Sequence, residues 1–238
     1  MGVPIAVSGP ASVSVSNLRG VGWVGLPDLQ QAKAYGPDPN SSATRDSLSA
    51  VGHVHALEAG TADPSLWMGN AEGVVLRFTL DRDGDRAGQW TLGSPIAAIA
   101  LDEATRAAFV ACGRNGIDDL YRIDTTDSSA TLLLSGLQNV VDLAFSEQTR
   151  SLWISERGTP DAGNGRLRRT TEAGAIVMTR SGLEPFGLAV DPSGTSCWVS
   201  DLKSNRLLEV SPNGGTVRMS PALDTPYRQV VYDPYVAP

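Results

Sequence analysis

A short apolar motif recurs five times along this 238-residue chain at a nearly constant interval. The first residues of successive copies are separated by 42, 44, 45 and 42 positions. Each copy has small apolar residues at its centre, as a strand buried on both faces requires. The copies span residues 54–60, 96–102, 140–146, 185–191 and 227–233. A period of this length indicates one supersecondary unit that buries its apolar face against its neighbours.

Three more strands are expected in each of the first four repeats. A large aromatic residue recurs at one register of the second strand, as packing between equivalent sheets requires. Those second strands cover 65–69, 107–111, 151–155 and 196–200, and their aromatic residues are Trp67, Phe109, Trp153 and Trp198. The expected third strands cover 74–80, 118–124, 165–171 and 206–211, with Leu76, Leu120, Leu167 and Leu207 aligned. Shorter and more polar outer strands are expected at 88–92, 130–134, 175–179 and 215–219.

Four strands per repeat, with the innermost the most apolar, predict an all-β fold: a β-propeller of about five four-stranded blades. The 25 glycines and 15 prolines suit many short strands joined by tight turns. A β-sandwich with accidentally regular spacing is the alternative.

The fifth motif is followed by only five residues, so its blade lacks three strands. Residues 5–8, 12–16 and 21–25 alternate in the manner of half-buried strands and can supply them. We therefore expect a ring closed by N-terminal strands that pair with the C-terminal strand, which removes exposed sheet edges. On this basis residues 1–50 form an N-terminal segment and residues 51–238 the propeller repeats. Alternatively, residues 1–50 are an arm that docks on another chain. Residues 27–50 are expected to be a loop, with a short helix near 29–35.

One repeat carries a family resemblance. Residues 185–194, with the sequence PFGLAVDPSG, are followed by Trp198–Asp201 and Asn205–Leu207. This stretch closely resembles the NHL repeat, and it is similar to repeats of streptogramin lyases, YVTN-type propellers and the gluconolactonase/regucalcin group. The resemblance is specific over about 185–215 and extends over 51–233 in hydrophobic pattern alone. It implies a propeller strongly and a function weakly, because this fold carries many activities.

Charge and composition restrict the partners. The net charge of −7 disfavours nucleic acid, because phosphate binding needs a basic face. No apolar run reaches the roughly 18 residues of a membrane span, so no membrane insertion is expected. No basic residue precedes Arg19, so a standard signal peptide is not expected. The compartment stays open, with a virion as one option.

Two short motifs suggest metals, and each has a simpler interpretation. His53 and His55, two positions apart on a strand, would point the same way, with Asp142 or Gln229 in an equivalent column as a further ligand. Hydrogen-bonded histidines near a channel mouth are the favoured interpretation. Asp81–Asp85 resembles the start of a calcium loop, but its Asp–Gly pair fits a hairpin turn better. We therefore predict no metal and no cofactor.

The family resemblance implies a ligand face built from the loops after the second and fourth strands of each blade. The candidate binding residues there are Asn70, Glu72, Arg114, Asn115, Glu156, Arg157, Asp161, Asp201 and Lys203. The candidate residues at the channel mouth are His55, Asp142, Phe186 and Arg228. A solvated face without a ligand is the alternative.

The sequence favours a non-enzymatic binding or structural module. Streptogramin lyases use a site that contains histidine, yet no histidine follows His55, and Phe186–Gly187 stands where the lactonase group favours Asn. Cys112 has no histidine within its repeat to activate it. We expect a subunit of a larger assembly, such as a phage tail or another virion component, with other protein subunits as partners. The alternative is a lyase- or lactonase-type enzyme at the channel mouth, and a sugar- or peptide-binding propeller is a third option.

Overall fold

The computed structural model describes residues 12–16, 21–35, 44–49, 51–80, 85–159 and 162–223. The regular structure of these residues is β-strand apart from one 3-10 turn, η1 (Pro27–Leu29). In this part of the chain no helix is long and apolar enough to cross a membrane.

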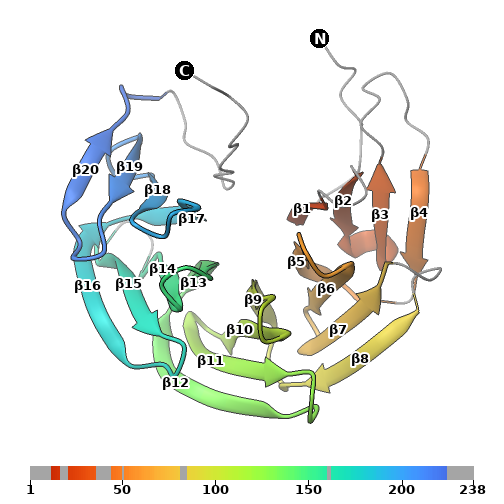
Figure 1. Ribbon diagram of the computed structural model, residues 1–238. Helices are drawn as coiled ribbons and strands as arrows, with labels where there is room; N and C mark the ends of the chain where they lie inside the picture. The colour runs from red at the N-terminus through yellow and green to blue at the C-terminus, as the bar shows by residue number, and fades with distance from the viewer. Residues whose placement is uncertain are drawn as a thin grey trace. The chain divides into compact units, whose positions relative to one another are not determined.

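The described strands form five antiparallel sheets of four strands each (Figure 1). The first sheet contains β1 (Ser12–Ser16), β2 (Val21–Leu26), β3 (Gln31–Tyr35) and β4 (Thr44–Ser49). The second contains β5 (Val54–Ala59), β6 (Ser65–Asn70), β7 (Val74–Thr79) and β8 (Arg86–Thr91). The third contains β9 (Ile96–Asp102), β10 (Ala107–Arg114), β11 (Ile117–Asp124) and β12 (Ala130–Gln138). The fourth contains β13 (Val140–Ser146), β14 (Ser151–Glu156), β15 (Gly165–Thr171) and β16 (Ile176–Leu183). The fifth contains β17 (Pro185–Val190), β18 (Cys197–Asp201), β19 (Arg206–Val210) and β20 (Thr216–Met219).

In every sheet each strand lies beside the next one in the sequence. The chain divides into two compact units: unit 1 is residues 1–114 with 122–131, and unit 2 is residues 115–121 with 132–238. Within unit 1 the first strands of successive sheets contact each other, β1 with β5 and β5 with β9. Within unit 2, β13 contacts β17 in the same way. The strands predicted from the repeat are therefore confirmed for the four repeats that start at residues 54, 96, 140 and 185.

The N-terminal part differs from the prediction. Residues 27–50 were expected to form a loop with a short helix, but they hold β3 and β4. In β3, Ala32 and Ala34 are buried while their neighbours are half-buried, which is a strand period of two. The pattern is easily missed because Ala and Lys are poor strand formers. Residues 12–49 thus complete a sheet of their own. The expected strands at 5–8 and 227–233, and with them the closure of the ring, lie outside the described residues.

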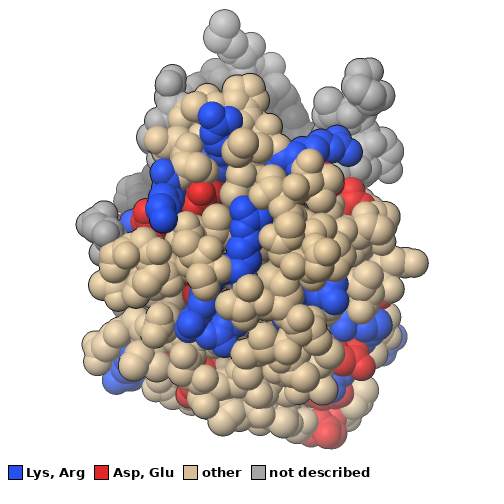
Figure 2. All heavy atoms as spheres, turned by 90° about the vertical axis from the view of Figure 1, so that its left-hand side faces the viewer, with Lys and Arg blue, Asp and Glu red and all other residues tan. Residues whose placement is uncertain are grey.

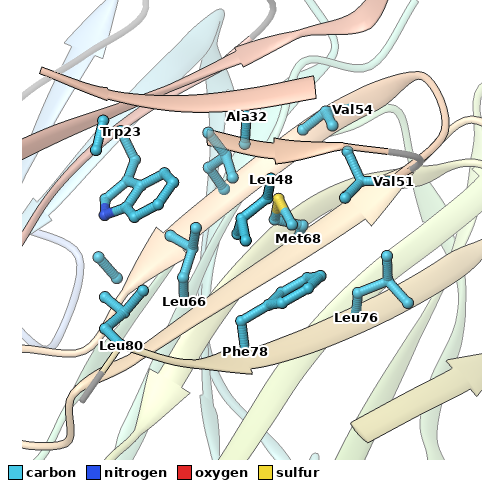
Figure 3. Close-up of a cluster of buried hydrophobic side chains, with 13 residues drawn as sticks. Trp23, Ala32, Leu48, Val51, Val54, Leu66, Met68, Leu76, Phe78 and Leu80 are labelled. Atoms are coloured by element: carbon cyan, nitrogen blue, oxygen red, sulfur yellow. The ribbon is translucent and has the colours of Figure 1, made fainter. Parts of the chain in front are cut away.

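Unit 1 has a hydrophobic core between its first two sheets (Figure 3). Trp23 of β2 and Leu48 of β4 lie in one cluster with Leu66, Met68 and Phe78 from the second sheet. In unit 2, Trp153 of β14 is fully buried within a cluster that continues into β17, β18 and β19. Apolar contacts between neighbouring sheets therefore stabilise each unit.

The aromatic column of the second strands is confirmed. Trp67, Phe109 and Trp153 are buried, and Trp198 is half-buried. The guanidinium of Arg77 lies 5.8 Å from the ring centroid of Trp67, directly across from it on β7. The expected leucine column is wrong in the second sheet, where the register pairs Gly69 with Val75 and thereby shifts Leu76 by one residue.

A backbone hydrogen bond repeats with the period of the sequence. N–H groups at or just after the ends of the second strands donate to the carbonyls that precede the first strands of the same sheets. These bonds are Ala71 to His53 (2.9 Å), Gly113 to Pro95 (3.0 Å), Arg157 to Asn139 (3.0 Å) and Leu202 to Glu184 (3.0 Å). The turns between second and third strands therefore lie beside the connections that enter each sheet. We call the surface formed by these turns and connections the loop face.

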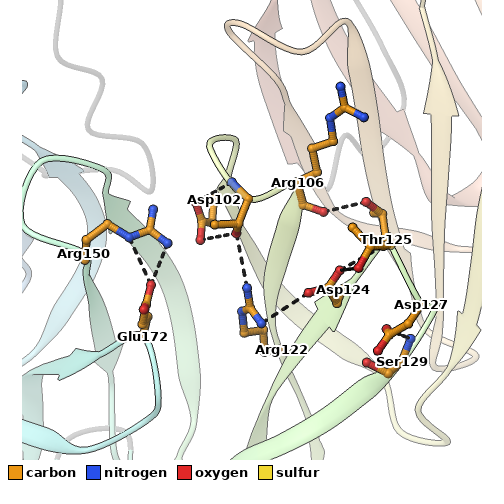
Figure 4. Close-up of polar contacts among 11 residues, drawn as sticks. Asp102, Arg106, Arg122, Asp124, Thr125, Asp127, Ser129, Arg150 and Glu172 are labelled. Carbon is orange, nitrogen blue, oxygen red and sulfur yellow. Dashed lines mark hydrogen bonds and ion pairs between the residues drawn. The ribbon is translucent and has the colours of Figure 1, made fainter.

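The turns between the first and second strands are also related (Figure 4). In unit 1 the Asp102 carboxylate accepts a 2.6 Å hydrogen bond from Thr105 Oγ1, and Arg106 follows with a φ of 56°. In unit 2, Ser146 and Thr149 make the corresponding 2.9 Å contact. Arg150, which follows Thr149, has a φ of 49° and forms an ion pair with Glu172 of the next hairpin at 2.6 Å. These side chains fix turns and offer no site for a ligand.

Candidate binding site on the loop face

The loop face of unit 2 contains a pocket of about 460 Å³. Its lining residues are Asn115, Gly116, Ile117, Gln138, Asn139, Gly158 and Thr159. They come from the turn before β11, the connection between β12 and β13, and the loop after β14. The volume lies within the range of small-molecule sites.

Backbone hydrogen bonds fix the wall of this pocket. Asn139 N–H donates to the Gly116 carbonyl at 2.9 Å, and Gly158 N–H donates to the Gln138 carbonyl at 3.1 Å. The side-chain Nδ2 of Asn139 donates to the Gly158 carbonyl at 3.2 Å. Asn115 and Asn139 have φ values of 57° and 55°, in the left-handed region that Asn tolerates better than most residues. The choice of Asn at these two positions is therefore explained by the turn geometry.

Two carboxylates support the pocket from below. Glu156 is fully buried, and its Oε2 accepts a 2.7 Å hydrogen bond from the Gln138 N–H. Arg166 Nη2 lies 2.9 Å from Glu156 Oε2, and Arg168 Nε lies 2.6 Å from Oε1. Asp118 Oδ2 accepts a 2.7 Å hydrogen bond from the Val140 N–H, and burial raises the pKa of that carboxyl. Glu156, a predicted binding residue, thus holds the β12–β13 connection from inside the fold.

The second and third sheets differ at the junction where the chain leaves the fourth strand beside the start of the third strand, and we call this place in the third sheet, at Gly116, the open junction. Gly73 and Gly116 each stand directly before a third strand, and each carbonyl accepts an N–H from the residue that follows the fourth strand. A Cβ on Gly73 would lie 2.6 Å from the Ser94 backbone nitrogen, so the chain closes on this glycine. A Cβ on Gly116 would meet no atom within 4 Å. The space beside this glycine is therefore filled by backbone in the second sheet and open in the third.

Three predicted residues of unit 2 meet around Glu184, a residue that sequence reasoning missed. Arg157 Nη2 lies 2.9 Å from Glu184 Oε1, and its guanidinium lies 5.7 Å from the Phe186 ring centroid. Asp201 Oδ1 accepts a 2.7 Å hydrogen bond from the Glu184 N–H. The available signal was the place of Glu184 directly before an inner strand. Lys203, also predicted, donates to the Gly182 carbonyl at 3.0 Å.

Three of the second strands end in a buried polar residue. These residues are Asn70 of β6, Glu156 of β14 and Asp201 of β18. Asn70 Nδ2 donates to the Val51 carbonyl at 3.1 Å, and its Oδ1 accepts the Val74 N–H at 2.8 Å. Each of these side chains therefore binds backbone of the connection that enters its own sheet. This shared role explains polar residues at that position without a ligand.

The other predicted residues of unit 1 lie at the surface. Glu72 Oε1 is 2.5 Å from His53 Nδ1, and this hydrogen bond lowers the pKa of the Glu72 carboxyl. Arg114 Nη2 donates to the Gly93 carbonyl at 3.3 Å. His53 and His55 are both exposed, and Val54 between them is buried. An irregularity in the β5–β6 register falls between Val54 and Ala56.

Among the described residues no group of three or more His, Cys, Asp or Glu could hold a metal ion. Asp161, Arg228 and Gln229 lie outside the described residues, as does most of the Asp81–Asp85 segment.

Asp142 joins two inner strands of unit 2. Its Oδ1 accepts the Leu143 N–H at 2.9 Å, and its Oδ2 accepts the Leu188 N–H of β17 at 2.7 Å. Burial raises the pKa of this carboxyl to about 7. Ser155 Oγ lies within hydrogen-bond distance of the carbonyls of both Asp142 (3.3 Å) and Phe186 (2.9 Å), so these two predicted channel-mouth residues lie close together. Cys197 is buried beside them, and burial raises the pKa of its thiol, which keeps it protonated and unreactive.

Comparison with known proteins supports the fold and assigns no family. No family model matches the chain. The Kuenenia stuttgartiensis hydrazine synthase structure is similar with a TM-score of 0.64 over 88% of this chain and 78% of that one, at 13% sequence identity. This chain has a β-propeller-like fold. A low-density lipoprotein receptor-related protein 1 from Pyricularia oryzae is 33% identical in an 82-residue alignment that covers 30% of this chain. The match spans about a quarter of that relative, 26% of its length.

Proposed function

We propose that this propeller-like chain is a non-enzymatic binding module that takes its ligand in the pocket beside Gly116. The observation that carries the proposal is the open junction, because the equivalent position at Gly73 is filled by backbone. The repeated fold does not require this open space, and a pocket of this kind is a candidate ligand-binding site. The similarity to part of a protein named as a receptor-related protein agrees with a binding role.

The composition of the pocket supports binding over catalysis. The described residues that line it include no Asp, Glu, His, Cys, Lys or Arg. General acid–base and nucleophilic mechanisms need such groups within hydrogen-bond reach of the substrate. The enzyme alternative would instead rest on His55 and Asp142. Both oxygens of Asp142 already accept backbone N–H groups, which favours a structural role for that carboxyl.

A ligand screen with two matched variants tests the proposal. Ile117 is 61% exposed at the pocket and Ile176 is 45% exposed on β16, so both accept a large side chain without disturbing the core. We would screen small neutral and charged fragments by ligand-observed NMR against the full chain, Ile117→Trp and Ile176→Trp. Fragments that bind the full chain and Ile176→Trp but not Ile117→Trp support the site. Fragment binding that is the same in all three proteins would refute it.

We further propose, as a separate role, that the chain is a subunit of a larger assembly such as a virion. Outer strands of unit 2 expose aliphatic side chains, and their face is largely uncharged with a line of basic residues (Figure 2). The exposed residues are Leu132 on β12, Ile176 and Val177 on β16, and Val217 and Met219 on β20. Such surfaces are candidates for protein contacts. The native mass of the chain purified from its source tests this role: a stoichiometric particle supports it, and a free 25.0 kDa monomer refutes it.

We infer that the blades are NHL-type and that the ring closes through residues 227–233, which would pair with the N-terminal strands. The resemblance over 185–215 supports the first inference, and the recurrence of the inner-strand motif supports the second. Deletion of residues 224–238 should then lower the melting temperature by several degrees. An unchanged melting temperature would contradict closure by this segment.

A further inference from the structure

The geometry of the pocket points to a neutral saccharide as its ligand, an inference that rests on the proposed binding function. Among the described residues four polar side chains line the pocket, and three of them, Asn115, Gln138 and Thr159, are exposed. Among the described residues none of the three side chains has a hydrogen-bond partner, so they are available to a ligand. Side-chain amides and hydroxyls both donate and accept, as the hydroxyl groups of a sugar do.

The surroundings disfavour a charged ligand. None of the described lining residues carries a charge. Of the cations near them in the chain, Arg157 is paired with Glu184 at 2.9 Å and Arg166 with Glu156 at 2.9 Å, and Arg114, next to Asn115, donates to the Gly93 carbonyl at 3.3 Å. A phosphate or carboxylate entering the pocket would lose water and meet only cations that already have partners, which is unfavourable. Phosphorylated and acidic sugars are therefore excluded from the inference.

The backbone of the pocket disfavours an extended peptide. Peptides that add to a sheet edge need unused N–H and carbonyl groups in the receptor. Here the Asn139, Gly158 and Arg157 N–H groups all donate to carbonyls of the same wall. Polar recognition is thus left to side chains, and these suit a ring of hydroxyls.

Ile117 provides the apolar contact. Its side chain is 61% exposed at the pocket and can pack against the C–H groups of a pyranose ring. The pocket volume of about 460 Å³ lies at the low end of small-molecule sites. We therefore expect a monosaccharide or the end of a short oligosaccharide.

Saturation-transfer NMR on the full chain tests the inference. The probes are glucose, galactose, mannose, N-acetylglucosamine and their β-linked or α-linked dimers, with glucuronic acid as the charged counterpart. We expect transfer to at least one neutral sugar and none to glucuronic acid. The signal should disappear in Ile117→Asp, which removes the apolar contact, persist in Ile176→Asp, and reflect about tenfold weaker binding in Gln138→Ala. Circular dichroism and thermal melting establish that each variant is folded.

The outcomes separate this inference from the proposed function. Transfer to no neutral sugar, or transfer that persists in Ile117→Asp, overturns the saccharide inference. If non-sugar fragments still distinguish the full chain from Ile117→Trp, the binding function stands without it. If no probe of any class distinguishes the two proteins, both fall.

Discussion

The carboxyl of Asp142 should make the stability of this chain depend on pH. Burial between β13 and β17 raises its pKa from 3.8 to about 7. Because the folded pKa is higher than the unfolded one, the folded state keeps a proton that the unfolded chain has lost between about pH 4 and 7. The stabilisation is thus complete below about pH 4 and is lost as the pH rises to about 7.

A shift of about three pKa units, at about 1.4 kcal/mol each, sets an upper bound of about 4 kcal/mol. Asp142→Asn removes the titration but keeps the shape. One amide hydrogen of the new side chain will face either the Leu143 or the Leu188 N–H, which costs about 1–2 kcal/mol at every pH. The variant should therefore be less stable than the natural chain near pH 4.5 and equally or more stable near pH 8.5.

Urea unfolding followed by tryptophan fluorescence between pH 4.5 and 8.5 measures both curves. Asp127→Asn is the matched control, because hydrogen bonds from Ser129 lower the pKa of the exposed Asp127 carboxyl. Its contribution has the opposite sign, present at neutral pH and lost as the pH falls. Parallel curves for the natural chain and Asp142→Asn would refute the reasoning, because they would show that Asp142 titrates alike in both states.

Three further tests concern the packing, a buried ion pair and the open junction. Trp153→Ala should lower the free energy of unfolding by about 3–5 kcal/mol, because the ring is fully buried; urea unfolding would contradict this with a loss under 1 kcal/mol. Glu156→Gln should cost about 3 kcal/mol by leaving two arginines without their counter-charge, whereas Glu172→Gln at an exposed ion pair should cost under about 1 kcal/mol; equal losses would contradict the assignment. Gly116→Ala should cost about 1–2 kcal/mol from its positive φ alone, and Gly73→Ala clearly more because its Cβ meets backbone; equal melting temperatures would contradict the open junction.

The sequence was informative wherever a pattern repeats. The spacing of small apolar residues located β9, β13 and β15 at their observed bounds, because strands at equivalent positions face the same packing demands. It failed at β3, where Ala32 and Ala34 bury a face too small to be recognised as apolar. Positions that repeat across blades could be compared, and positions that occur once could not.

The candidate site was only partly predictable. Asn115 was among the predicted residues, but Gln138, Asn139 and Thr159 lie in connections whose proximity depends on the sheets around them. Glu156 and Asp201 were singled out for their charge, yet both are buried and bind backbone. A polar residue at the end of a strand can bind the backbone of its own chain or a ligand. The burial of the side chain distinguishes these two roles, and burial cannot be read from the sequence.

The order of strands in each sheet has a consequence for biosynthesis. Every strand lies beside the strand that precedes or follows it in the chain, so a sheet needs no residue outside its own stretch of roughly 40. Loop closure over such short distances is fast compared with pairing between distant segments. A nascent chain can therefore complete one sheet on the ribosome before the next has been translated. Hairpins that form in this order are paired with their own neighbours before an edge of another molecule can reach them.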